Sequence, residues 1–100
     1  MTRNAYATKK QIEFAATLTA RAATWIESWK EQMPDSDSRK PALIARIDAA
    51  MAKLATLSID RQIEILRSGA DLYPTTPAEM VRAAALIVMY AEAEGRTPPC

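Results

Sequence analysis

Apolar residues recur every three or four positions along most of this chain, the spacing that gathers side chains on one face of an α-helix. The clearest row comprises Ile12, Ala15, Leu18, Ala22, Trp25 and Trp29. No glycine or proline interrupts the chain between Thr8 and Pro34, and only 2 of the 100 residues are glycine. Alanine, the strongest helix former, is frequent. The sequence therefore predicts an all-α fold.

Start and stop signals divide this pattern into a compact bundle of four helices, predicted at approximately 9–33, 39–54, 59–68 and 77–94. Thr8 and Gln11 fit a capping box at the start of the first helix. Thr76 and Glu79 fit the same motif before the fourth helix, and they are the strongest local signal in the chain.

The connections are predicted less directly. We expect Ser38 to cap the second helix and Ser58 to cap the third. Gly69 is expected to end the third helix by adopting a left-handed conformation. In the loop that follows, Leu72 or Tyr73 is expected to be anchored on the core.

The fourth helix carries the longest apolar run, from Ala83 to Ala91. A helix that is apolar nearly all round is expected to be central and covered by the others. The run covers about half of the ~20 residues that a bilayer crossing requires. We therefore expect a single soluble domain over 1–100, with short flexible ends at 1–7 and 96–100. Without an apolar leader, and with Cys100 as its one cysteine, the chain is expected to be cytoplasmic.

The residue content disfavours catalysis. The chain has no histidine and one cysteine, so nucleophile–base pairs and zinc sites are not expected. Its two glycines, Gly69 and Gly95, lie 26 positions apart, which excludes phosphate-binding glycine loops. Two carboxylate pairs share helix faces: Glu27 with Glu31, and Asp60 with Glu64. These pairs are typical of solvated helix faces, and we predict no enzyme activity, cofactor, metal or small-molecule substrate.

A row of cations marks the second helix. Arg39, Arg46 and Lys53 are spaced seven apart and line up on one side, with Lys40 beside the first. The row, called the basic stripe below, covers ~21 Å. Such a row could follow a phosphate backbone, meet an acidic strip on a protein, or be an ordinary solvent face. With 13 basic and 12 acidic residues, the net charge of +1 provides no overall field toward nucleic acid.

Aromatic side chains supply the other candidates. Trp25 and Trp29 are expected in the core, although Trp29 lies near the end of a long helix that could project from the domain. Trp, Tyr and Arg dominate many protein interfaces, so Trp29, Tyr6 and Tyr73 are candidate anchors. The predicted partner-binding residues are Arg39, Lys40, Arg46, Lys53, Trp29 and Tyr6.

Two segments carry a resemblance to known proteins. The first is residues 7–14, Ala-Thr-Lys-Lys-Gln-Ile-Glu-Phe, and the second is residues 57–66, which begins with Leu-Ser. Together they cover about a fifth of the chain. They resemble a helical module of phage and mobile-element proteins, with an Ala-Thr-x-Lys-Gln start, that in some cases accompanies DNA-processing enzymes. By its format, a small helical chain without catalytic residues, the protein is also similar to anti-CRISPR proteins, which commonly occupy a surface of a CRISPR effector complex.

These resemblances imply a non-catalytic protein-binding inhibitor or adaptor whose partner is a host or effector-complex protein. The alternative is a nucleic-acid-associated accessory protein that binds phosphates through the basic stripe, with Lys9, Lys10 and Arg61 extending the path. A homo-oligomeric scaffold is a third hypothesis. No membrane partner is expected.

Overall fold

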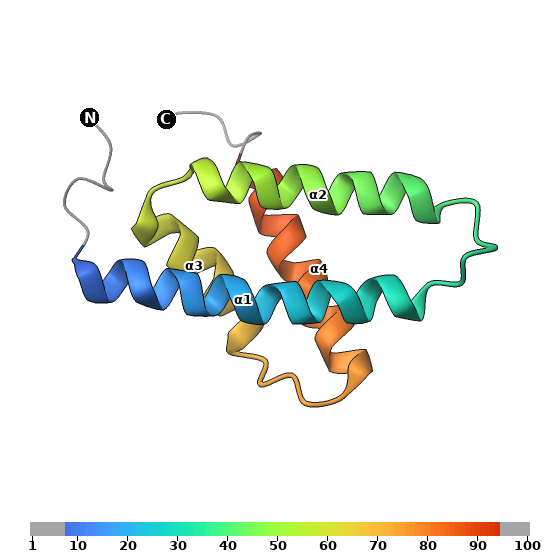
Figure 1. Cartoon of the computed structure of the whole chain (residues 1–100), viewed down its shortest axis with the longest axis horizontal. Coiled ribbons are helices and arrows are strands. Elements are labelled where there is room, and N and C mark those ends of the chain that lie inside the picture. The colour runs from blue at the N-terminus through green and yellow to red at the C-terminus, as the bar shows by residue number, and fades with distance from the viewer. Residues whose placement is uncertain (1–7, 95–100) are drawn as a thin grey trace.

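In the computed structural model, which describes residues 8–94, these residues form four α-helices and no strand (Figure 1). The helices are α1 (Lys9–Gln32), α2 (Lys40–Thr56), α3 (Ile59–Ala70) and α4 (Pro77–Glu94). This confirms the all-α prediction, and each boundary lies within two residues of its expected position. The predicted flexible ends, and with them Tyr6 and Cys100, lie outside the described residues.

Local hydrogen bonds set the starts of two helices as the sequence predicts. At α1, the Thr8 hydroxyl accepts from the Gln11 amide at 3.1 Å, and the Gln11 side-chain oxygen accepts from the Thr8 amide at 2.9 Å. At α4, the Thr76 hydroxyl accepts from the Glu79 amide at 3.2 Å, and the Glu79 carboxylate accepts from the Thr76 amide at 3.1 Å. Each exchange satisfies amide groups that have no partner within the helix. Beyond its cap, α1 is one continuous helix of 24 residues.

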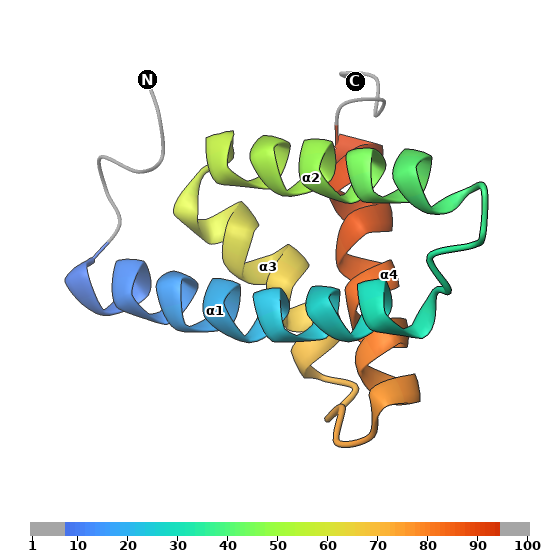
Figure 2. The ribbon, with the colours of Figure 1, turned by 45° about the vertical axis from the view of Figure 1, so that its right-hand side comes forward.

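The four helices pack around α4. α1 and α2 run in opposite directions, and α4 crosses both of them (Figures 1 and 2). α4 packs against α1, α2 and α3, and α1 also packs against α3, whereas α1 and α2 meet only slightly. The buried side chains of α4 are 0–1% exposed: Ala83, Ala84, Ile87, Val88 and Ala91. α4 is therefore the central helix, as predicted.

The outer side of α4 is not covered, although its sequence is apolar there too. Met89 is 48% exposed and Tyr90 is 43% exposed. The three neighbours of α4 therefore bury only part of its surface. Among residues 8–94, no helix has the length and the apolar character needed to span a membrane.

The structure corrects the predicted end of α3. Gly69 does not end the helix: α3 continues through it to Ala70, and the left-handed residue is Tyr73, with a φ of 50°. Gly69 is instead buried against neighbouring helices, where a side chain has little room. Neither Leu72 nor Tyr73 is anchored on the core, and the Tyr73 side chain is 80% exposed.

The start of α2 also differs from prediction. Ser38 does not cap it; Arg39 is the residue before the first turn and makes no side-chain cap hydrogen bond. The loop is held by Asp37, whose carboxylate accepts from the Arg39 amide at 2.9 Å. Aspartate can fold back on the chain two residues ahead, and here this bond orders the loop before α2 without capping the helix. Ser58 caps α3 as predicted, accepting from the Arg61 amide at 3.2 Å.

Candidate functional site

The first half of the basic stripe is paired with loop carboxylates. Arg39 donates to the two carboxylate oxygens of Asp37 at 3.1 and 2.9 Å. These side-chain hydrogen bonds, with the one from the Arg39 amide, lower the pKa of Asp37 to about 2. Lys40 forms an ion pair with Asp35. Both cations are therefore matched by acids of the loop that precedes them.

The second half of the basic stripe faces the carboxyl end of α4. Arg46 donates to both oxygens of Glu92, at 2.6 and 2.7 Å, a bidentate pair between α2 and α4. Lys53 adds a favourable charge interaction with Glu94. Glu92 and Glu94 lie in the last turn of α4, where the helix dipole is negative and no basic residue is present. Arg46 and Lys53 thus compensate charge that α4 would otherwise carry alone.

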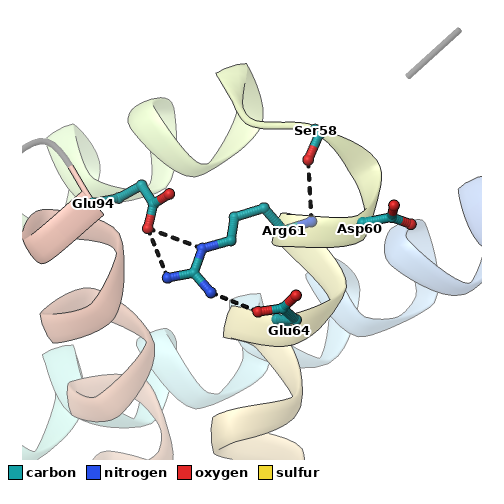
Figure 3. Close-up of a pocket in the computed structure, with 5 residues that line it drawn as sticks. All are labelled: Ser58, Asp60, Arg61, Glu64 and Glu94. Atoms are coloured by element: carbon teal, nitrogen blue, oxygen red, sulfur yellow. Dashed lines mark hydrogen bonds and ion pairs between the residues drawn. The ribbon is translucent and has the colours of Figure 1, made fainter. Parts of the chain in front are cut away.

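Arg61 of α3 completes this charge compensation (Figure 3). It donates to one Glu94 oxygen from two nitrogens, at 2.9 and 2.7 Å, and to Glu64 at 2.6 Å. The Arg61 hydrogen bonds hold the pKa of Glu94 below its ordinary value. The guanidinium fixes α3 to the end of α4, and three of its five N–H donors are engaged.

The hollow around Arg61 does not suit an anion or a metal ion. It has a volume of about 330 Å³ and is lined by Ser58, Asp60, Arg61, Glu64 and Glu94 (Figure 3). Its single cation is already bound by two of its carboxylates, so a phosphate would meet net negative charge. No group of three or more metal-ligating side chains occurs among residues 8–94. The hollow is therefore best explained as the surface of an ion-pair network.

The predicted site residues fall into separate places. Trp29 is half-buried and packs against the core, and Trp25 is buried, as expected of both. The loop between α1 and α2 returns Lys40 to the end of α1, where it lines a shallow hollow with Lys30 and Met33. Arg46 lies instead beside α4, in a hollow with Glu92. Tyr6 lies outside the described residues.

A further hollow, between α1 and the α3–α4 loop, was not predicted. It measures about 320 Å³ and is lined by Arg21, Trp25, Ala70, Tyr73, Pro74 and Thr75. Tyr73 is one of the candidate anchors predicted from the sequence, and Arg21 is not among the predicted site residues. The sequence gives no signal for their meeting, because it depends on the left-handed conformation of Tyr73 and on how α3 packs against α1.

Comparison with known proteins adds no further assignment: no family model matches this chain, and neither a curated protein nor a solved structure is detectably similar to it.

Proposed function

We propose that this protein is a non-catalytic protein-binding module that acts as an inhibitor or adaptor of a partner protein. The observation that carries the proposal is a contrast at the surface. Each cation of the basic stripe interacts with a carboxylate of the same chain. In contrast, several large apolar and aromatic side chains are exposed to solvent: Phe14, Met89 and Tyr90 on the helices, and Tyr73 in the α3–α4 loop. Exposed aromatic side chains on a rigid frame favour contact with protein.

The paired cations count against the nucleic-acid alternative. To reach a phosphate, Arg46 would have to give up its bidentate bond with Glu92, whose carboxylate lies at the negative end of α4. The same holds for Arg61 and its bonds to Glu64 and Glu94. Lys9 and Lys10 make no ion pair with any of residues 8–94, and two lysines provide few phosphate contacts.

The partner that we propose is a host or effector-complex protein in the cytoplasm, and specifically a surface of a CRISPR effector complex. Support comes from the resemblance of residues 7–14 and 57–66 to a phage and mobile-element module, and from the small helical format. The basic stripe remains a candidate contact, because the side chains of Arg39 and Arg46 are 76% and 54% exposed while they are paired.

The experiment is affinity capture of host proteins on the full chain, with and without nuclease, followed by titration of the purified captured protein at low and high salt. Under the proposal, a defined protein is retained after nuclease, and its affinity falls only modestly with salt. The matched control is a Lys9→Ala, Lys10→Ala variant, which lacks the two lysines available for phosphate contacts and is expected to retain the same protein. Capture that disappears with nuclease, and affinity that falls steeply with salt, would overturn the proposal in favour of nucleic acid.

The basic stripe is tested separately by charge reversal at Arg39, Arg46 and Lys53. Under the proposal, the purified partner binds this variant much more weakly, while the circular dichroism of the variant stays helical. Unchanged partner binding would remove the basic stripe from the interface and leave the exposed apolar side chains as its location.

A further inference from the structure

The hollow between α1 and the α3–α4 loop, here called the Arg21–Tyr73 pocket, combines side chains from three elements. α1 supplies Arg21 and the buried Trp25, α3 supplies its last residue, Ala70, and the loop supplies Tyr73, Pro74 and Thr75. Its volume of about 320 Å³ lies at the lower end of the range of ~300–1,000 Å³ for ligand sites. An open hollow of this size suits a few side chains of a bound segment.

The charge of this pocket is not compensated from within. Its lining contains one cation, Arg21, and no carboxylate. Arg21 forms no ion pair with any other of the described residues, whereas Arg39, Arg46 and Arg61 are each bound to a carboxylate of this chain. A guanidinium presents a planar set of donors that matches a carboxylate with two parallel hydrogen bonds. The complementary group is therefore an acidic side chain.

The rest of the lining is largely apolar. Trp25, Ala70 and Pro74 line the space beside Arg21, together with the exposed Tyr73. An acidic group alone would leave these surfaces in contact with water, so the best occupant also carries an apolar side chain.

The backbone holds Tyr73 in a conformation that its own packing does not explain. A φ of 50° is uncommon for a residue with a β-carbon, and such positions concentrate at functional sites. The turn is fixed by hydrogen bonds from the Leu72 amide to the Gly69 carbonyl at 3.1 Å and from the Tyr73 amide to the Ala70 carbonyl at 3.0 Å. Beyond it, the Thr75 hydroxyl donates to Glu79 at 3.1 Å. Folding thus orders the loop while leaving its aromatic ring in solvent.

We propose that the Arg21–Tyr73 pocket is the docking site for a segment of the partner protein that carries a carboxylate next to an apolar side chain. The proposal rests on the proposed function as a protein-binding module, and it locates the interface. Arg21 binds the carboxylate, and Tyr73 and Trp25 contact the apolar side chain. Trp, Tyr and Arg together make the residue set that dominates interface affinities.

The probe is a displayed library of short linear peptides, selected on the full chain and counter-selected on an Arg21→Gln, Tyr73→Ser variant. Both residues are exposed, so the variant is expected to keep the helical circular dichroism of the parent. Enriched peptides are expected to share Asp or Glu next to an apolar residue. Arg21→Gln alone and Tyr73→Ser alone are each expected to weaken the affinity of the chain for an enriched peptide about tenfold or more. The matched control, Arg82→Gln, changes an exposed arginine outside the pocket and is expected to leave the affinity for the enriched peptides unchanged.

A double-mutant cycle tests the specific pairing. Replacing the peptide's carboxylate by its amide is expected to weaken binding to the parent chain but to have little further effect on the Arg21→Gln variant. Enrichment of peptides without an acidic residue, equal binding to the pocket variant, or no enrichment at all would overturn the proposed pocket. Such a result leaves the proposed function standing if the partner from the lysate is still captured after nuclease. Binding of that partner to the Arg21→Gln, Tyr73→Ser variant then distinguishes failure of the proposed pocket from failure of the proposed function.

Discussion

Gly69 lies where α3 packs against Trp25 of α1 and against Ala83 and Ile87 of α4, and replacing it by alanine tests how tightly this contact is packed. An added β-carbon would lie 2.9 Å from the Ile87 Cδ1 atom, 3.0 Å from the Ala83 carbonyl oxygen and 3.0 Å from the Trp25 Cζ3 atom. Carbon atoms in contact prefer about 3.5–4.0 Å. Ile87 and Ala83 are 0% exposed, so neither has free space into which it can move.

Two opposed effects determine the size of the change. Alanine is favoured over glycine within a helix by about 1 kcal/mol. Overpacking a filled core costs about 1–3 kcal/mol, and here one of the three contacts is to backbone, which moves only if α4 moves. Because of this backbone contact we expect an overpacking cost of about 2–3 kcal/mol, which leaves a net loss of about 1–2 kcal/mol in the free energy of unfolding. For a domain of this size, that lowers the Tm by roughly 5–15 °C.

The assay is urea unfolding followed by helical ellipticity, with the slope compared between variants to check that both unfold alike. Ala52→Gly is the matched control, because Ala52 is exposed in the middle of α2 and loses helix propensity without a packing change. It is expected to cost about 1 kcal/mol. If Gly69→Ala instead stabilised the protein by about that amount, the close packing inferred around Gly69 would be refuted.

Two further predictions concern local interactions. Thr8→Ala removes the hydroxyl that accepts from the Gln11 amide and is expected to lower the free energy of unfolding in urea by about 1 kcal/mol. The control, Thr24→Ala, changes an exposed position within α1 and should not lower it. Equal effects of the two substitutions would contradict the capping role. Asp37 is expected to titrate by NMR with a pKa of about 2, and Arg39→Gln should return it toward its ordinary 3.8. Because the folded-state pKa is the lower one, the ionised carboxylate stabilises the protein above about pH 4, and this contribution is lost as the pH falls toward 2, so Asp37→Asn should flatten that part of the stability profile. A pKa for Asp37 near 3.8 in the parent chain would show that Arg39 does not hold it.

Features that depend on neighbours in the sequence could be predicted. The apolar spacing gave the four helices, and the pairs Thr8–Gln11 and Thr76–Glu79 gave two of their starts, because donor and acceptor lie three residues apart. The central position of α4 followed from an apolar content that no other helix has.

Features that depend on packing could not. Gly69 reads as a helix end in the sequence, yet its role is set by Ile87 and Trp25, which come from other helices. The spacing of Arg39, Arg46 and Lys53 places them on one side of α2 but does not say what that side faces. That side faces carboxylates, and one of them, Glu92, is separated from Arg46 in the sequence by all of α3 and the two connections that flank it.

The attachment of α2 has a consequence for how the protein opens. α1, α3 and α4 each pack against the other two, whereas α2 packs mainly on α4 through Ile47, Ala50 and Leu54. Detaching α2 therefore breaks mainly its contact with α4, and a slight one with α1, and leaves the other three helices packed together. The free energy of local opening therefore differs between helices, and backbone amides of α2 exchange their hydrogens with solvent through an opening of lower free energy than those of α4. What that opening uncovers is a second apolar side of α4, reached without unfolding the chain.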